Sequence, residues 1–151
     1  MIYCKKSEMQ VNKMTDKKQL IQAALDCLKN SYAPYSKFNV SAAVLAGSGK
    51  IYTGVNVENA SYPAGICAER NAVFHAAACG EREITAIAIV GGRNYTPSEY
   101  CSPCGICRQV MREFCDPDKM TVIIARSVDD SKEYTLSQLL PESFGPEMLG
   151  E

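Results

Sequence analysis

The 151-residue sequence lacks the features that mark several large classes of protein. It contains no apolar run close to the ~20 residues that a membrane-spanning helix needs, and it has no dense cluster of Lys and Arg. Its formal net charge is −1, whereas binding to the phosphates of a nucleic acid requires a strongly basic surface. We therefore expect no membrane and no nucleic acid among its partners, and a small molecule as its substrate.

The N-terminal residues also lack an apolar segment followed by a small-residue cleavage site, so nothing in the sequence directs the chain to an oxidising compartment. We expect a cytoplasmic protein with reduced thiols. This expectation governs the interpretation of its eight cysteines. Closely spaced thiols in a reducing compartment more often bind a metal or take part in chemistry than form disulfides.

The spacing of apolar residues predicts helices that alternate with strands. Residues 1–14 show no periodicity that would bury a face, and we expect them to be a mobile extension of a single domain at 15–151. Helices are expected at 15–30, 68–79 and 104–114, strands at 38–45, 51–57, 84–90 and 120–125, and a weak strand and turn at 133–140. Gly91 and Gly92 are expected to end the strand before them. This order predicts the α/β class, with a mixed five-stranded sheet in a three-layer α/β/α arrangement.

Three cysteines have the setting of metal ligands. Cys104 and Cys107 open a predicted helix at a spacing that fits one zinc ion. Thiols at a helix N-terminus face exposed N–H groups and the positive end of the helix dipole, and both favour the thiolate that a metal needs. Cys67 has the same setting at the head of another predicted helix. We predict that these three cysteines bind Zn²⁺, with no obvious fourth ligand.

Glu69 separates a catalytic zinc site from a structural one. Three protein ligands leave one position of the metal for water, which is the mark of a catalytic site. Glu69 lies near the metal, two residues beyond Cys67, without being needed as a ligand, and this suits a carboxylate that moves protons. A Cys-x-Glu segment followed by Pro-Cys-x-x-Cys is the arrangement described for zinc deaminases. A closed structural site, with Cys101 as its fourth ligand, is the alternative.

The other cysteines and the single histidine are expected to have no role in this site. Small core or surface positions are the ordinary interpretation for four cysteines, namely Cys4, Cys27, Cys79 and Cys115. His75 falls in the middle of a predicted helix, where we expect a packing or surface residue and not a ligand.

Longer segments closely resemble those of homotetrameric cytidine deaminases. They are YAPYSKF at 32–38, GVNVENASYP at 54–63, ICAER at 66–70 and SPCGICRQ at 102–109. The resemblance runs from about residue 16 to the C-terminus. It is more specific than the cysteine spacing, because the segments at 56–59 and 143–147 are not shared by deaminases in general.

The resemblance implies hydrolysis of cytidine to uridine, and of deoxycytidine to deoxyuridine, with release of ammonia in pyrimidine salvage. Glu69 would take a proton from water, protonate N3 of the base and help the amino group to leave. Asn56 and Glu58 would hydrogen-bond a ribose hydroxyl, Phe38 would pack against the pyrimidine, and Ala68 would also contact the substrate. Without the resemblance, Glu58 would be interpreted as a solvated loop acid.

The resemblance also implies a homotetramer with four zinc ions and with active sites shared between subunits. Phe144 would stack in the site of a neighbouring subunit, although by itself it would be interpreted as a tail-packing residue. Tyr62 would lie near an adjacent site.

Three thiolates overcompensate the charge of one Zn²⁺, and the Arg70 guanidinium could withdraw part of that charge by donating hydrogen bonds to them.

Three alternative functions follow from the same residues. A deaminase of another cytosine-bearing small molecule, such as a nucleoside antibiotic, would share the zinc motif but has less reason to carry Asn56, Glu58 and Phe144 together. A deaminase of polynucleotides would need a basic groove or an aromatic platform. A non-catalytic structural zinc protein would keep the cysteines without requiring Glu69.

Overall fold

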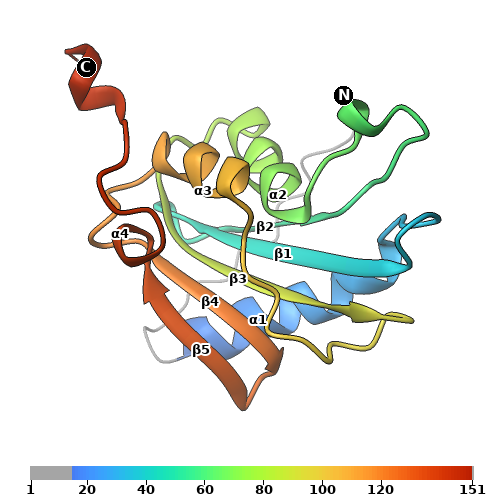
Figure 1. Cartoon of the computed structure of the whole chain (residues 1–151). Helices are drawn as coiled ribbons and strands as arrows, with labels where there is room; N and C mark the ends of the chain where they lie inside the picture. The colour runs from blue at the N-terminus through green and yellow to red at the C-terminus, as the bar shows by residue number, and fades with distance from the viewer. Residues whose placement is uncertain (1–14, 151) are drawn as a thin grey trace.

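The computed structural model describes residues 15–150, which form a five-stranded sheet with helices on both faces (Figure 1). The helices are α1 (Thr15–Cys27), α2 (Ala68–Ala78), α3 (Gly105–Arg112) and α4 (Leu136–Leu139), with 3-10 turns η1 (Leu28–Asn30), η2 (Tyr62–Ala64) and η3 (Pro146–Leu149). The strands are β1 (Phe38–Ala46), β2 (Ile51–Val55), β3 (Ile84–Arg93), β4 (Thr121–Ser127) and β5 (Asp130–Thr135). The predicted mobile extension at 1–14 lies outside the described residues.

The sheet has the order β2-β1-β3-β4-β5. β3 and β4 are parallel, and the other neighbouring pairs are antiparallel. The predicted mixed five-stranded sheet and three-layer α/β/α fold are therefore confirmed.

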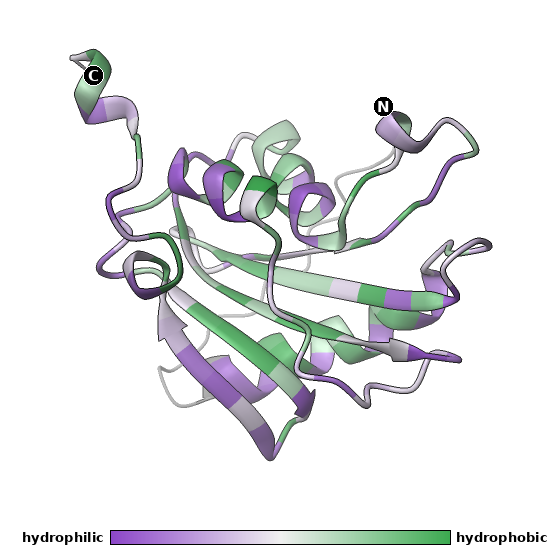
Figure 2. Ribbon diagram, in the orientation of Figure 1, coloured by the Kyte–Doolittle hydropathy of each residue, from purple (hydrophilic) through white to green (hydrophobic). Residues whose placement is uncertain are grey.

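Alternation along the central strands gives the protein two cores. On β3, Ile87 and Ile89 pack beneath α2 and α3, whereas Ala88 and Val90 face α1. Side chains of a strand point alternately to opposite faces of a sheet, so a strand covered on both faces is apolar throughout. Figure 2 shows this concentration of hydrophobic residues in β3 and β4, beside a largely hydrophilic edge strand β5. No helix in the described part of the chain is long and apolar enough to span a bilayer.

The prediction that Gly91 and Gly92 end the third strand is wrong. Both glycines continue the pairing of β3 with β1, opposite Val40 and Asn39. Glycine is needed at 92 because a Cβ atom there would lie 1.9 Å from the Thr96 carbonyl oxygen. The glycine therefore marks a close approach of the following loop and not the end of a strand.

The C-terminal part of the sheet also differs from the expectation. β5 begins at Asp130, before the predicted weak strand at 133–140, and the residues expected to turn form helix α4. Thr135 caps this helix by accepting a hydrogen bond from the Gln138 amide, and the Gln138 side chain accepts one from the Thr135 amide. The alternation of an exposed edge strand is weak, so its start is poorly marked in the sequence.

Close packing of β2 against α2 sets the position of the helix that follows Cys67. A Cβ atom at Gly54 would lie 2.3 Å from the Ala72 nitrogen and 2.7 Å from the Ala68 carbonyl oxygen. Both contacts are with backbone, so neither can be relieved by a change of side-chain rotamer. Any larger residue at 54 must move the first turns of α2.

Replacing Gly54 by Ala is therefore expected to lower the free energy of unfolding by roughly 1–3 kcal/mol, the usual cost of overpacking. Denaturant titration of the variant measures this change. Gly105→Ala is the matched control, because a Cβ atom at Gly105 meets no atom within 4 Å. Equal stability of the two variants would show that the contact between β2 and α2 is not tight.

Candidate metal centre and its pocket

The N-termini of α2 and α3 lie close together, and a cysteine is the N-cap residue of each helix. Cys67 is the N-cap of α2 and Cys104 the N-cap of α3, both with extended backbone and without a capping hydrogen bond from the side chain. Cys107 lies in the first turn of α3 and is fully buried. The N-terminal amides and the dipoles of both helices therefore favour negative charge on these sulfurs.

The structure brings the three predicted ligands together with the spacing of a single metal ion. The Sγ atom of Cys104 lies 4.0 Å from that of Cys67 and 3.4 Å from that of Cys107, and all three lie within 4.8 Å of one another. Zn–S bonds of ~2.3 Å at tetrahedral angles place neighbouring sulfurs ~3.8 Å apart. The donor set thus fits zinc. Cys101 is not part of this group.

Hydrogen bonding divides the thiols into proton donors and an acceptor. The Cys107 thiol lowers the pKa of Cys67 to about 5 by donating to it, and Arg70 and Cys104 act in the same direction. The pKa of Cys107 is raised, because its proton is held by Cys67 and because it is buried. Arg70 lies in the first turn of α2, and its Nη2 atom is 3.8 Å from the Cys67 sulfur. Arg70 therefore lies within hydrogen-bonding distance of one of the three sulfurs, and its effect on the charge of a bound metal stays a prediction.

Zinc binding is expected to release at least one proton per chain near neutral pH, since Cys107 is a thiol in the metal-free protein. As the pH falls, the proton competes more strongly for this sulfur and the affinity for zinc decreases. The apparent binding constant should rise about tenfold per pH unit for each proton released. Titration of metal-free protein against a competing chelator at several pH values measures it. A binding constant that does not change with pH would contradict the assignment.

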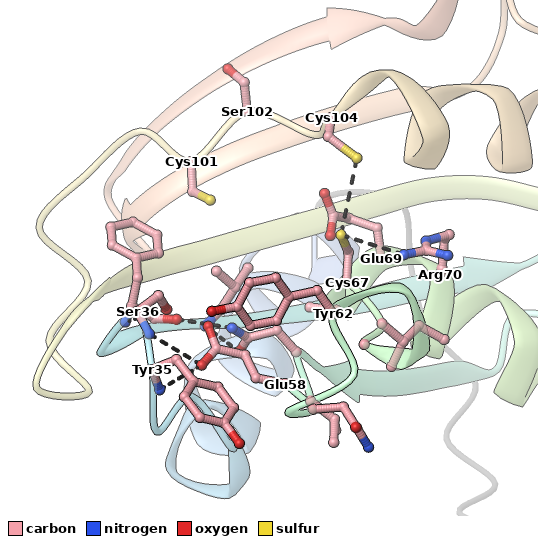
Figure 3. A pocket seen from close by; sticks show the side chains of 18 residues that line it. Tyr35, Ser36, Glu58, Tyr62, Cys67, Glu69, Arg70, Cys101, Ser102 and Cys104 are labelled. Atoms are coloured by element: carbon pink, nitrogen blue, oxygen red, sulfur yellow. Dashed lines mark hydrogen bonds between the residues drawn. The ribbon is translucent and has the colours of Figure 1, made fainter.

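Glu69 is the buried carboxyl group beside these sulfurs. It is 4% exposed, and Figure 3 shows its carboxylate close to Cys67 and Cys104. Burial raises its pKa to about 7, and the negative charge of Cys67 adds to the effect. A carboxyl group with a pKa near neutrality can both accept and return a proton at that pH. Glu69 is thus suited to proton transfer next to the metal.

A pocket of about 580 Å³ opens in front of this centre. It is lined by Tyr35, Ser36, Phe38, Val40, Asn56, Val57, Glu58, Asn59, Tyr62, Gly65, Ile66, Cys67, Ala68, Glu69, Arg70, Cys101, Ser102 and Cys104. In Figure 3 the sulfurs and Glu69 occupy one end, and Glu58 lies toward the other with Tyr35 and Ser36. The volume is that of a small-molecule site.

The end of the pocket away from the sulfurs carries a negative charge. Glu58 Oε2 accepts hydrogen bonds from the Tyr35 amide at 2.9 Å and the Ser36 amide at 3.2 Å. The Ser36 hydroxyl and these amides hold the pKa of Glu58 below its usual value. An ionised carboxylate therefore faces the pocket at neutral pH, and it can accept a hydrogen bond from a ligand hydroxyl.

Of the predicted substrate-binding residues, five line this pocket and one does not. Phe38, Asn56, Glu58, Tyr62 and Ala68 belong to its wall. Phe144 lies on the C-terminal tail, where its side chain is exposed and its carbonyl oxygen accepts a hydrogen bond from Gln109. The tail runs away from the sheet in Figure 1. The roles predicted for these side chains, including the role of Phe144 in a neighbouring subunit, stay predictions.

His75 lies on the exposed side of α2, away from the sulfur group, as expected. Its Nδ1 atom lies 3.1 Å from the Thr53 carbonyl oxygen, and its ring packs edge-on against Tyr52. Cys115 packs at the border of the core that contains α2 and α3. Cys4 lies outside the described residues.

The amides of Tyr35 and Ser36 are functional groups of the pocket that the sequence does not reveal. The sequence predicts a turn at 32–36, and turns present unpaired amide groups. The turn is therefore a signal for free amides, but whether they face the Glu58 carboxylate depends on the position of the segment after β2, which carries Glu58. That segment is held by Tyr32, whose amide donates to the Asn56 backbone carbonyl oxygen at 3.0 Å and whose carbonyl accepts from the Glu58 amide at 2.8 Å.

The fold and the site together define an α/β protein with three thiols gathered for a metal and a buried carboxyl group beside them, the arrangement described for zinc-dependent deaminases. The sequence model of the family described as "Cytidine and deoxycytidylate deaminase zinc-binding region" matches residues 14–124. The chain belongs to this family, which confirms the resemblance and the zinc cofactor.

Individual relatives agree with this assignment. The cytidine deaminase of Halalkalibacterium halodurans is 40% identical over 136 residues, which cover 90% of this chain and 99% of the relative. That of Sporosarcina psychrophila is 42% identical over 134 residues, which cover 89% and 95% of the two chains. The crystal structure of cytidine deaminase from Burkholderia pseudomallei matches with a TM-score of 0.74 at 42% identity, covering 83% of this chain and 97% of that one.

Proposed function

We propose that this protein catalyses the hydrolytic deamination of cytidine to uridine and of deoxycytidine to deoxyuridine, with release of ammonia. The observation that carries the proposal is the buried Glu69 carboxyl group, placed beside three gathered thiols at the end of a pocket of nucleoside size. The names of the relatives support the substrate. Cytidine and deoxycytidine share the base that this end of the pocket would receive.

Cys67, Cys104 and Cys107 would hold the zinc ion, which when bound supplies a Lewis acid that lowers the pKa of water. Glu69 accepts a proton from the attacking water as its oxygen adds to C4, and delivers that proton to N3 of the base. It then moves the second proton of the water from the added oxygen to the amino nitrogen. The C4–N bond breaks, ammonia leaves, and C4 keeps the oxygen as the carbonyl of uridine.

Other wall residues would hold the nucleoside in place. Phe38 would pack against the pyrimidine, and Ala68, at the head of α2, would contact the base. Asn56 and Glu58 would bind a sugar hydroxyl, since an amide N–H and a carboxylate together satisfy both the acceptor and the donor of a hydroxyl group. Tyr62 lies at the mouth of the pocket, where its side chain is 79% exposed.

We further infer a cytoplasmic homotetramer that works in pyrimidine salvage. The exposed Phe144 supports the prediction that this residue completes the site of a neighbouring subunit, because an aromatic side chain 56% exposed on a projecting tail is available to another chain. A sizing column and the zinc content per chain test the assembly. A monomer with full activity would overturn the shared-site prediction.

The test of the proposed function is the loss of ultraviolet absorbance when zinc-loaded protein is mixed with cytidine. Turnover of cytidine and deoxycytidine supports the proposal. Turnover only of a cytosine-bearing nucleoside antibiotic, or only of single-stranded DNA, would assign the chain to another class of deaminase. Zinc binding without turnover of any of these would make the centre structural.

A further inference from the structure

Two polar side chains are buried directly behind the pocket without lining it. Ser31, which follows η1, is 5% exposed, and Asn39 on β1 is 4% exposed. Buried polar groups in proteins are nearly always hydrogen-bonded, because leaving them unpaired is costly. Their partners connect both of them to Asn56.

The hydrogen bonds form a single chain with one direction. The Tyr95 amide donates to Asn39 Oδ1 at 3.2 Å, and Asn39 Nδ2 donates to the Ser31 hydroxyl oxygen at 3.1 Å. The Ser31 hydroxyl has its own proton left, and it donates this proton to Asn56 Oδ1 at 2.5 Å. Every donor thus points toward Asn56.

This chain saturates the acceptor side of the Asn56 amide. Oδ1 also accepts from the Val40 amide at 2.9 Å, so both of its lone pairs are used. Nδ2 donates one hydrogen to the Phe38 carbonyl oxygen at 2.9 Å. The backbone partners identify the oxygen and the nitrogen without ambiguity, because an amide proton must face Oδ1 and a carbonyl must face Nδ2. Among the residues that the structure describes, the second Nδ2 hydrogen of the Asn56 side chain has no partner, and it is left for a ligand.

The direction of the chain also strengthens that remaining donor. Hydrogen bonds to an amide oxygen draw electron density from the nitrogen, and successive bonds polarise one another. Asn56 therefore offers the pocket a strengthened donor and no acceptor. Glu58 offers an acceptor and no donor. Asn56 and Glu58 together recognise a group that both accepts and donates a hydrogen bond, and a hydroxyl group does both.

We propose that Ser31 and Asn39 are positioning residues that make Asn56 a donor to a ring hydroxyl of the sugar. The inference rests on the proposed function, because it takes a nucleoside as the ligand. It predicts that changes behind the pocket alter the recognition of the sugar and not the chemistry at the base. Tyr95, on the loop after β3, is the outer end of the same chain.

The test compares Ser31→Ala with Ser41→Ala on two substrates. Ser41, on β1, is the matched control, because it is a buried serine like Ser31 but its hydroxyl donates, at 2.7 Å, to the Ala24 carbonyl oxygen on α1. The substrates are cytidine and 2′,3′-dideoxycytidine, which lacks both ring hydroxyls. A hydrogen bond worth about 0.5–1.5 kcal/mol corresponds to about a 2- to 12-fold change in binding.

Ser31→Ala is expected to raise KM for cytidine by about 2- to 12-fold, to leave kcat for cytidine within about twofold, and to leave kcat/KM for dideoxycytidine unchanged. Ser41→Ala is expected to change none of these values. Asn39→Ala, which acts one bond further away, should change the same value in the same direction and serves if Ser31→Ala does not fold. Equal losses on both substrates, or an unchanged KM for cytidine, would overturn the inference alone. A wild-type protein without turnover of cytidine would overturn the proposed function as well.

Discussion

Replacing Glu69 by Gln is expected to reduce the turnover of cytidine by at least about 10²- to 10⁴-fold, the usual contribution of a positioned acid–base group. Gln has nearly the shape of Glu, but an amide NH2 group replaces one carboxylate oxygen, and the side chain cannot accept a proton from water. The zinc content should remain at the wild-type value, because the sulfur group does not include Glu69. Absorbance assays and metal analysis of the same sample measure the two quantities together.

The control for this variant is Glu81→Gln. Glu81 lies beyond the end of α2, where Ser48 and Tyr52 donate to its carboxylate, and it does not line the pocket. The Glu81→Gln protein should turn over cytidine at the wild-type rate. Wild-type turnover by the Glu69→Gln protein would remove the central step of the mechanism, and loss of zinc from that protein would make Glu69 a ligand.

Replacing Cys107 by Ser is expected to remove both zinc and activity. Cys107 is fully buried in the first turn of α3, beside the other two sulfurs. A serine oxygen at this position would be a harder donor than a thiolate, on a shorter side-chain bond. The loss of affinity should exceed the ~10- to 100-fold that removal of an outer hydrogen-bond partner costs at a metal site. Metal analysis after dialysis against a mild chelator measures the effect.

Cys101→Ser is the matched control, because Cys101 lies in the same segment and lines the same pocket. Its thiol is not one of the three sulfurs that lie together, and burial raises its pKa to about 12. The variant should keep its zinc and most of its activity. If it lost zinc as Cys107→Ser does, Cys101 would be a fourth ligand, and the structural interpretation of the centre would replace the catalytic one.

The chemistry of the site was more predictable than its shape. Short-range spacing places Cys104 with Cys107, and Cys67 with Glu69, at two helix starts, so the ligand types and the proton carrier are readable from the sequence. The proximity of the two helix starts depends on the pairing of β3 with β1 and β4. A nearly continuous apolar run at 84–90 indicates a central strand of such a sheet, and the resemblance to cytidine deaminases supplies the remaining specificity.

What the sequence did not show is the direction of individual polar groups. The two glycines at the end of β3 suggest a turn unless the close approach of the Thr96 carbonyl is known. The resemblance predicts that Asn56 binds the sugar, but no sequence pattern reveals that its side-chain oxygen is saturated by the Ser31 hydroxyl and the Val40 amide. Such contacts join residues far apart in the chain, and they follow from tertiary packing and not from local propensity.

The distance along the chain between Cys67 and Cys104 has a consequence for biogenesis. These two residues are 37 positions apart, and β3 runs between them. An unfolded chain would have to close that loop to chelate the ion with both, at an entropic cost that the native sheet has already met. The metal therefore binds the native state far better than the denatured one, so bound zinc raises the free energy of unfolding of the whole domain. A shortage of zinc would therefore shorten the lifetime of newly made protein as well as abolish its activity.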